Sequence, residues 1–448
     1  MQQAKLYQDR KLLFVDTAGN YVSFCERLAK DWGKVYYYCP NYSGWPDLKK
    51  SMVGERLKDV KVIEQMWWKC NDYGTTEGDY VFNEIDDFVF ADVYMGDVQM
   101  HLIHDLGKKN VWGSRKSEEL ELLRFETKEK LKEIGLPVTP TINFENFVAL
   151  MEFLDEQNTP MFIKLSWFRG VMESGKFEGM VESVEMLAEL NKQLKDCAAD
   201  EGENAMELIA ETPIESDIEI GVDTDSIDGE SPNETMYGIE IKDKFYISTH
   251  CPFEKLPEQL QYTLFGLNKL INRYGENGCR MDISTEIRID EKGQGHLIDI
   301  TMRFPSPPSE IKQEWITNIS QKIKEGSEGK VVEPIFKTKY AAQIEIHSLY
   351  AKDNRVDFEI PDEIKDFVKL KNYCGVEKTG SQKYAVIPTG DLVEIANIVA
   401  YDDTIEGCIK KLHEYADKIK AENITIHWDA VDKAMEETEK MHKAGIKF

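Results

Sequence analysis

The chain has 448 residues, a mass of 51.7 kDa, and 82 acidic against 55 basic side chains, which gives a formal net charge of −27. This acidity argues against a nucleic-acid-binding surface, because phosphate backbones need a basic face, but it is compatible with a locally basic pocket for a small phosphorylated ligand. The length predicts two or three domains, and an apolar content of 42% excludes a disordered chain.

Signals for export, membrane insertion and zinc binding are missing from the sequence pattern. Residues 1–10 are polar and lack the apolar core of a signal peptide, and no apolar stretch approaches the roughly 18 residues of a membrane helix. The eight cysteines are scattered, without a C-x-x-C pair or a Cys/His cluster. We therefore expect a cytoplasmic protein with neither a membrane nor a nucleic-acid partner.

The N-terminal region, residues 1–115, alternates short apolar runs with helical patterns. Strands are predicted at 11–16, 35–39, 87–91 and 111–112, and helices at 21–32 and 97–106. This β-α-β rhythm indicates a parallel sheet with crossover helices. A charged helix is expected next, over 117–134, with its end at Gly135.

The middle region, residues 116–330, reads as a mixture of helices and paired strands. Helices are predicted at 144–157 and 260–274, and strands at 161–165, 208–210, 217–223, 281–290 and 296–303. Residues 238–247 predict a strand pair that turns at 242–244, and residues 291–295 predict the turn of a hairpin. The acidic, Ser-rich segment 223–235 contains Gly and Pro and is predicted to be a surface loop.

The C-terminal region, residues 331–448, is expected to form a smaller closing domain of mixed α/β type. Strands are predicted at 340–350, 384–388 and 393–400, and a helix at 405–419. The whole chain is therefore assigned to the α/β class, with an α+β middle domain.

The predicted hairpin brings acidic side chains onto one face. If Ile289 faces His296, counting outward from the turn places Glu286 opposite Asp299. Alternate residues share a face, so the same side also carries Asp282, Ser284, Thr301 and Arg303. Facing carboxylates repel, and Mg²⁺ that holds a polyphosphate would relieve this repulsion. The alternative is a solvated acidic face with Arg303 as its counter-ion.

Three further charged residues stand next to apolar strand patterns. Lys164 lies within the apolar run 161–165 and is either a cation over a phosphate or a lysine that reaches solvent at a strand edge. Glu211 follows an apolar strand and precedes Thr212-Pro213, which suits a hinge where backbone groups form hydrogen bonds with the edge of a purine base. Glu219, eight residues later, is placed to accept hydrogen bonds from ribose hydroxyls. Taken alone, each glutamate also fits an ordinary surface charge.

The order of these elements resembles the ATP-grasp superfamily. Arg124 lies on the helix before the turn Gly135-Leu136-Pro137, and it is followed by the strand lysine Lys164, by Glu211 and by Glu219. The segment Asp299-Ile300-Thr301-Met302-Arg303 is similar to the E-x-N-x-R signature of that superfamily. The stretch 303–307 and the region 384–419 are similar to phosphoribosylamine–glycine ligases, so the closest subgroup is expected to be ligase proteins of that kind.

This resemblance implies a domain division, a reaction and roles for individual residues. It implies a pre-ATP-grasp domain over 1–115, an ATP-grasp domain over 116–330 and a C-terminal α/β domain over 331–448. It implies an ADP-forming carboxylate–amine ligase that uses ATP and Mg²⁺, or alternatively Mn²⁺, on two small-molecule substrates. The implied roles are phosphate contacts for Arg124 and Lys164, the adenine hinge for Glu211, ribose binding for Glu219, metal binding for Glu286 and Asp299 with Asp282 as the alternative to Glu286, and charge neutralisation during catalysis for Arg303.

The sequence also departs from the ligase pattern. Bulky residues occupy 166–170, including Trp167, where the ligases have a glycine-rich phosphate loop, and Arg169 is expected to compensate as a cation. The first turn, 16–20, has a single glycine, Gly19, where the ligases have a glycine-rich turn that reads a sugar phosphate. This turn and the loop 41–47 together form a hypothetical acceptor site. Two other hypotheses therefore remain open: a nucleotide-binding protein of the same fold that has lost its chemistry, and an unrelated acidic scaffold or interaction protein.

Overall fold

A computed structural model of the chain describes residues 4–40, 53–63, 84–166, 174–201, 207–216, 218–376, 382–390 and 392–448. Over these ranges, no helix is both long and apolar enough to cross a membrane. The loop 41–47 and residues 167–170, which we singled out in the sequence, lie outside the described residues.

The N-terminal region forms the expected parallel sheet. In spatial order its strands are β3 (Val60–Ile63), β2 (Trp32–Tyr38), β1 (Tyr7–Val15), β4 (Asp87–Phe90) and β5 (Val111–Trp112). Helix α1 (Val22–Ala29) connects β1 to β2, and helix α3 (Gly96–His104) connects β4 to β5. The central strands β1 and β4 end in fully buried apolar runs, as expected for a parallel sheet covered on both faces.

The single helix predicted over 117–134 is wrong. The chain forms a 3₁₀ turn at Arg115–Glu118, then α4 (Glu119–Leu122) and α5 (Arg124–Glu133). Leu123 separates the two helices because its φ of −96° and ψ of 73° are not helical. Neither proline nor glycine marks this break in the sequence. Because of the break, α5 begins at Arg124, whose side chain is buried toward the centre of the molecule.

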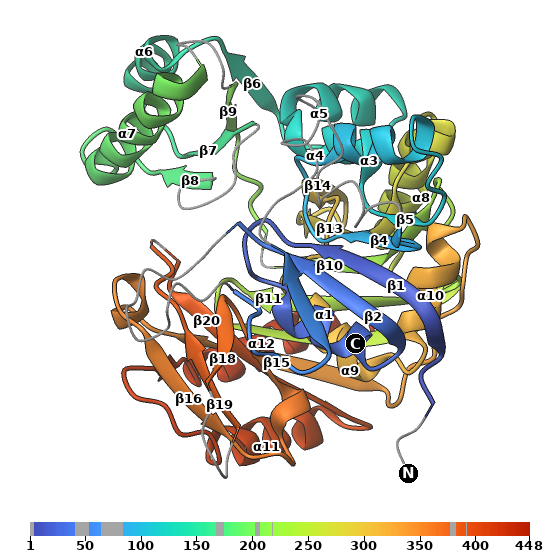
Figure 1. The fold of residues 1–448 in the computed structure, drawn as a ribbon. Helices are drawn as coiled ribbons and strands as arrows, with labels where there is room; N and C mark the ends of the chain where they lie inside the picture. The colour runs from blue at the N-terminus through green and yellow to red at the C-terminus, as the bar shows by residue number, and fades with distance from the viewer. Residues whose placement is uncertain are drawn as a thin grey trace.

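A small lobe stands apart from the rest of the chain (Figure 1). Its antiparallel sheet has the order β6 (Thr141–Phe144), β9 (Leu208–Glu211), β7 (Met161–Leu165) and β8 (Ser174–Phe177). Helices α6 (Phe147–Gln157) and α7 (Val184–Glu201) pack against it. Helix α6 begins three residues later than predicted, because the side chain of Asn146 caps it by accepting a hydrogen bond from the amide of Ala149.

One large antiparallel sheet runs through the middle and C-terminal regions. Its strands, in spatial order, are β14 (Gly295–Thr301), β13 (Arg280–Ile289), β10 (Ile218–Ile227), β11 (Glu234–Ile241), β12 (Phe245–Pro252), β15 (Tyr340–His347), β20 (Glu394–Asp402) and β17 (Val368–Leu370). Strand β21 (Thr425–Ile426) also pairs with β15. The domain boundary expected near residue 330 stays a prediction, since β12 and β15 on its two sides are hydrogen-bonded neighbours.

The surface loop predicted over 223–235 is wrong for its first half. Strand β10 continues to Ile227, and Asp223, Asp225 and Ser226 are buried in it. Asp223 accepts a hydrogen bond from the hydroxyl of Tyr246, and Asp225 pairs with Lys322 at 2.8 Å. These partners come from β12 and from a helix about a hundred residues away, so the local composition gave no sign of them.

The remaining elements surround this sheet. Helices α8 (Glu258–Asn272), α9 (Ser309–Trp315), α10 (Ile319–Ser327), α11 (Ile405–Ala416) and α12 (Asp429–Lys443) cover it, and β16 (Val356–Ile360), β19 (Gln382–Val386) and β18 (Tyr373–Val376) form a separate small sheet. The chain is thus a mixed α/β protein, with a parallel sheet in its N-terminal region and antiparallel sheets elsewhere.

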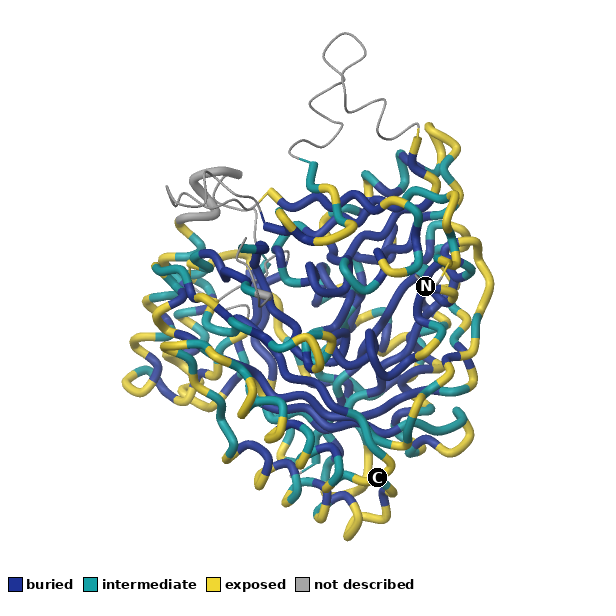
Figure 2. Tube along the Cα trace, turned by 60° about the horizontal axis from the view of Figure 1, so that its bottom comes forward, coloured by how far each residue is buried: buried dark blue, intermediate teal, exposed yellow. Residues whose placement is uncertain are grey.

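The apolar core of the small lobe is separate from the core that runs through the rest of the chain. One continuous cluster of buried residues joins the N-terminal sheet, the large sheet and the C-terminal region, whereas the small lobe has its own cluster. Figure 2 shows the buried residues following the strands through the interior. Phe304, just after β14, ties the first two parts together, because its ring packs 4.6 Å from that of Phe24 and its carbonyl accepts from Tyr21 at 2.5 Å.

Candidate active site

The hairpin of β13 and β14 places Glu286 opposite Asp299, as predicted, and it also places Ser284 opposite Thr301. The counting that led to this prediction was off by one at the turn, where Ile289 faces Gly295 and not His296. A β-bulge restores the register, because Ile298 is an extra residue between the pairs Ile287–Leu297 and Glu286–Asp299. Without this bulge, Ile298 would lie opposite Glu286, and the carboxylate of Asp299 would point to the other face of the hairpin.

Two cavities meet at this carboxylate pair. The inter-lobe cleft, about 630 Å³ in volume, lies between the small lobe and the large sheet, and its lining includes Phe162, Lys164 and Arg288. The sheet cavity, about 510 Å³, lies over the large sheet and reaches residues 305–307 and 392–394. Glu286 and Asp299 line both cavities, so an ion or ligand bound by these two carboxylates would contact molecules in each cavity.

A buried ion-pair cluster supports the cleft from the side of the small lobe. Glu211 lies between two lysines: it pairs with Lys128 and lies 3.3 Å from the ammonium of Lys164. Lys164 also donates to the carbonyl of Ile298 at 2.8 Å, which links the small lobe to the bulge of β14. Burial lowers the pKa of Lys128 to about 8, although Glu211 opposes this shift. Lys128 was not singled out in the sequence.

Arg124 and Glu219 both lie beside the site and both have protein partners. The guanidinium of Arg124 contacts Asp299 at 3.1 Å and donates to the carbonyl of Leu165, so it lies behind the carboxylate pair. Arg124 is not among the described residues that line either cavity. Glu219 lines both cavities and pairs with Arg288 at 2.6 Å.

The two facing carboxylates differ in their charge state. Burial alone would raise the pKa of Asp299, but Lys164, Arg124 and Lys242 hold it well below its usual value. Burial raises the pKa of Glu286 to about 8, against the pull of Lys242 and with the help of Glu240 and Asp299. Its carboxylate forms neither a hydrogen bond nor an ion pair with another described residue. The pair therefore has one ionised member, Asp299, and one member, Glu286, that keeps its proton up to a pH of about 8.

Lys242 is a functional candidate that the sequence reasoning missed. It lies in the turn between β11 and β12, lines both cavities and lies 3.7 Å from Glu240. Glu240 and Glu286 raise its pKa above the ordinary value, so it remains a cation. A lysine in a predicted turn carries no local signal, and only the pairing of β11 with β10 brings it to the carboxylates.

Arg303 and the alternative ligand Asp282 lie in different surroundings. Arg303 lines the sheet cavity, and its Nε donates to Glu121 at 2.8 Å. Asp282 is fully buried and accepts from Lys312 at 2.5 Å. Asp282 is absent from the described lining of both cavities, so the structure does not bring it to the pair formed by Glu286 and Asp299.

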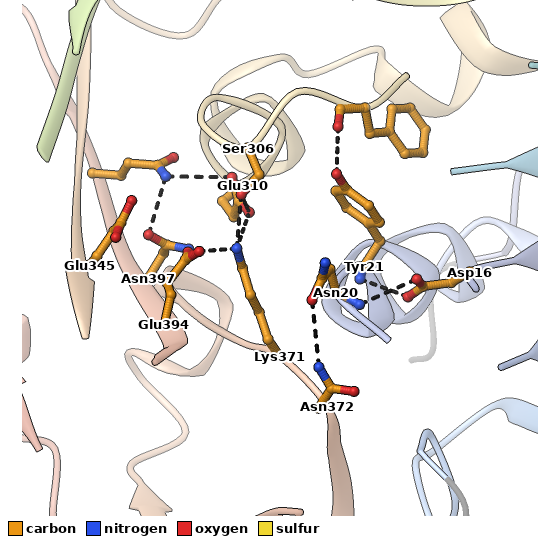
Figure 3. Close-up of polar contacts among 12 residues, drawn as sticks. Asp16, Asn20, Tyr21, Ser306, Glu310, Glu345, Lys371, Asn372, Glu394 and Asn397 are labelled. Atoms are coloured by element: carbon orange, nitrogen blue, oxygen red, sulfur yellow. Dashed lines mark hydrogen bonds and ion pairs between the residues drawn. The ribbon is translucent and has the colours of Figure 1, made fainter. Parts of the chain in front are cut away.

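The first turn and the end of the sheet cavity are shown in Figure 3. Asp16 folds back on its own turn and accepts from the amides of Gly19, Asn20 and Tyr21, at 2.8, 3.2 and 2.7 Å. Figure 3 shows Asp16 beside Asn20 and Tyr21. The neighbouring network has Lys371 at its centre, 2.5 Å from Glu394 and in contact with Ser306 and Glu310. The turn predicted as an acceptor site is thus filled by its own carboxylate.

Comparisons with known proteins identify the architecture. The sequence matches no family model and no curated protein. The fold is similar to phosphoribosylamine–glycine ligase from Thermotoga maritima, with a TM-score of 0.62, 15% identity, and coverage of 93% of this chain and 98% of that one. It is also similar to biotin carboxylase from Campylobacter jejuni, with a TM-score of 0.61, 15% identity, and coverage of 93% of this chain and 92% of that one. For L-amino acid ligase from Bacillus licheniformis, the TM-score is 0.57, the identity is 15%, and the coverage is 94% of this chain and 99% of that one. The resemblance suggested by the sequence is therefore confirmed at the level of architecture: the chain has the ATP-grasp fold.

Proposed function

We propose that this protein is an ATP-dependent, ADP-forming ligase that joins a small carboxylate to a small amine. The observation that carries the proposal is the facing pair Glu286–Asp299 at the junction of two cavities, one with cations from the small lobe and one with Arg303. Two cavities that share a charged wall suit a reaction between a nucleotide on one side and a second substrate on the other.

The proposed chemistry has two balanced steps. A carboxylate oxygen attacks the γ-phosphorus of ATP, the bond to the β-phosphate oxygen breaks, and ADP leaves an acyl phosphate behind. The nitrogen of the amine then attacks the acyl carbon, phosphate departs and one proton is released. Neither step needs a protein nucleophile, so the protein contributes position and charge neutralisation. The biotin carboxylase of Campylobacter jejuni was solved as a complex with β-γ-ATP, which supports placing a nucleotide in this fold.

The inter-lobe cleft is the proposed nucleotide site. Lys164 lines it and would neutralise the α- and β-phosphates, with Arg124 adding positive charge from behind Asp299. Glu211 would mark the hinge that reads adenine, and Glu219 would accept from the ribose hydroxyls. For Glu219 this role requires its pairing with Arg288 to loosen.

The carboxylate pair fits a divalent cation. No group of three or more Asp, Glu, His or Cys side chains is gathered for a metal within the described ranges. Two carboxylates are nevertheless a sufficient protein contribution for Mg²⁺, which usually completes its shell with phosphate oxygens and water. Glu286, which forms no ion pair with a described residue, and the ionised Asp299 would hold it. When bound, Mg²⁺ would neutralise phosphate charge.

Arg303 is the proposed catalytic cation. It lines the sheet cavity next to Thr301 and is held in place by Glu121, so its guanidinium is positioned before substrates bind. It would stabilise charge on the transferred phosphoryl group or on the tetrahedral intermediate.

The test is a screen of carboxylates and amines for ADP release with Mg²⁺ and ATP. With an active pair, Arg303→Ala should slow the reaction by about 30- to 1,000-fold, since the loss of one preorganised donor costs about 2–4 kcal/mol. Arg273→Ala, at an exposed arginine that lies 3.9 Å from Glu133, is the matched control and should leave the rate unchanged. Full activity of the Arg303 variant would remove this residue from the mechanism.

A second candidate function is nucleotide binding without ligase chemistry. Thr301 favours it, because a hydroxyl is a weaker metal ligand than the amide oxygen of the asparagine that the resemblance leads us to expect there. This alternative predicts binding of ATP but no ADP release with any carboxylate and amine. A scaffold function predicts no thermal stabilisation by Mg²⁺ and ATP at all.

A further inference from the structure

We propose that Lys128 is a positioning residue for the nucleotide: by neutralising Glu211, it leaves the ammonium of Lys164 available to bind phosphate. This inference rests on the proposed function, because it concerns the cleft proposed for ATP. It stands on a buried carboxylate that two lysines share, on the fact that one of these lysines lines the cleft while the other lies behind it, and on the contacts that hold each of them.

The two lysines approach Glu211 from different parts of the chain. Glu211 ends β9, and its Oε1 contacts the ammonium of Lys128 on α5, while its Oε2 lies 3.3 Å from the ammonium of Lys164 on β7. All three side chains are buried. One carboxylate is thus shared by two cations, and with both lysines protonated the three side chains carry a net positive charge.

The two lysines differ in their access to the proposed nucleotide site. Lys164 lines the inter-lobe cleft, whereas Lys128 is absent from the described lining of that cleft. Lys128 lines a cavity of about 20 Å³ behind it, against Leu297 and Ile300 of β14, which has room for about one water molecule. An effect of Lys128 on a nucleotide in the cleft therefore passes through Glu211 and Lys164.

Lys128 is held in place and remains a cation at neutral pH. Its ammonium donates to the hydroxyl of Thr139, which lies on the connection between α5 and β6. Burial lowers the pKa of Lys128 to about 8, against the attraction of Glu211 and together with the repulsion of Lys164. Most molecules therefore carry the proton on Lys128 at pH 7, so it supplies a full counter-charge to Glu211.

Lys164 keeps donor capacity for a phosphate oxygen. An ammonium group has three N–H donors. Among the described residues, the contacts of Lys164 are the carbonyl of Ile298, at 2.8 Å, and Oε2 of Glu211, at 3.3 Å. The carbonyl is uncharged and the carboxylate is shared with Lys128, so these two contacts leave part of the charge of Lys164 uncompensated on the wall of the cleft.

The loss of Lys128 would change the charge of Lys164 without touching it. A buried carboxylate needs a cation, and Lys164 would then be the cation left beside Glu211. A phosphate oxygen would have to compete with Glu211 for the same ammonium. Lys128 thus keeps Lys164 from becoming one half of a neutral ion pair.

The test measures ADP affinity on the full chain by titration calorimetry with Mg²⁺. Lys128→Met should weaken ADP binding by about 10- to 100-fold, since a hydrogen bond to a charged group contributes that much. Adenosine, which lacks phosphates, should bind both proteins equally in competition with ADP. The double variant Lys128→Met with Glu211→Gln should bind ADP at least about tenfold more tightly than Lys128→Met, because removal of the carboxylate releases Lys164 again.

The matched control is Lys132→Met, at an exposed lysine of the same helix that pairs with Glu129 at 2.6 Å, and it should bind ADP as wild type does. A purely structural role of Lys128 predicts weaker binding of both ADP and adenosine, and no recovery in the double variant. Either result would overturn the inference.

The outcomes separate this inference from the proposed function. If wild-type protein binds no ADP, the proposed nucleotide site fails and this inference fails with it. If wild type and Lys128→Met bind ADP equally, the role of Lys128 is wrong while the ligase proposal stands. Where Lys128→Met does not fold, the double variant decides, since it leaves no carboxylate at position 211: ADP binding about tenfold weaker than in wild type would overturn the inference.

Discussion

Replacing Glu345 with glutamine should make the stability of this protein less dependent on pH. The pKa of Glu345 is raised from 4.5 to about 9 in the folded protein, mainly by burial and then by Glu394. A carboxyl group with a raised folded-state pKa favours folding at low pH, and this contribution is lost as pH rises from the unfolded value toward the folded one. Wild-type protein should therefore lose stability over this window in a way that Glu345→Gln does not.

The size of the effect follows from the width of the window. Each pH unit between 4.5 and about 9 corresponds to about 1.4 kcal/mol, so the variant should gain roughly 2–3 kcal/mol over wild type between pH 5 and pH 7. The other charged groups near this carboxyl are present in both proteins and largely cancel in the difference. They are His347 on the same strand, Glu394 on β20, Lys371, Asp243 in the β11–β12 turn and Glu310 on α9.

Urea unfolding of both proteins at pH 5, 6, 7 and 8, followed by tryptophan fluorescence, measures this difference. Glu254→Gln, at an exposed position, should follow the wild-type curve at each pH. A difference between Glu345→Gln and wild type that stays constant from pH 5 to pH 8 would refute the reasoning, because it would mean that Glu345 titrates normally in the folded protein.

Two further predictions concern packing. Gly19→Ala should cost about 1–3 kcal/mol in unfolding experiments, because Gly19 has a φ of +76° and a new Cβ would lie 2.3 Å from the side-chain oxygen of Asn372. Gly107→Ala, with a φ of +65° and nothing within 4 Å of the new Cβ, controls for the backbone cost, and equal losses in the two variants would exclude the clash. Lys312→Met should destabilise the protein by about 3–5 kcal/mol, because it leaves Asp282 buried without its cation. Recovery of stability in the double variant with Asp282→Asn would confirm that cause. A single variant as stable as wild type would contradict it.

Much of the architecture could be predicted from the sequence because its signals are local. Apolar runs at 11–16, 87–91 and 161–165 correspond to strands, and the β-α-β rhythm of the first region corresponds to the parallel sheet. The pairing of Glu286 with Asp299 could also be predicted from the hairpin, although the bulge at Ile298 compensated for an error of one residue at the turn.

What the sequence did not reveal depends on partners far along the chain. The segment from Asp223 to Ser226 looks like a loop until Lys322 and Tyr246 are placed beside it. Lys242 reaches the site only through the pairing of its neighbouring strands, and Glu345 becomes part of the sheet cavity only because β15 joins the same sheet. Local patterns define elements, whereas the charge of a cavity is decided by side chains that the fold brings together.

The separate core of the small lobe has a consequence for how the two substrates would meet. Glu286, Asp299 and Glu345 all belong to one hydrogen-bonded sheet, so the span between the carboxylate pair and the Glu345 end of the sheet cavity is set by a single scaffold. The small lobe reaches that scaffold through the bond from Lys164 to the bulge residue Ile298. A swing of the lobe would open the nucleotide side while the reacting distance on the acceptor side stays unchanged, so loading of ATP and selection of the amine would be mechanically independent.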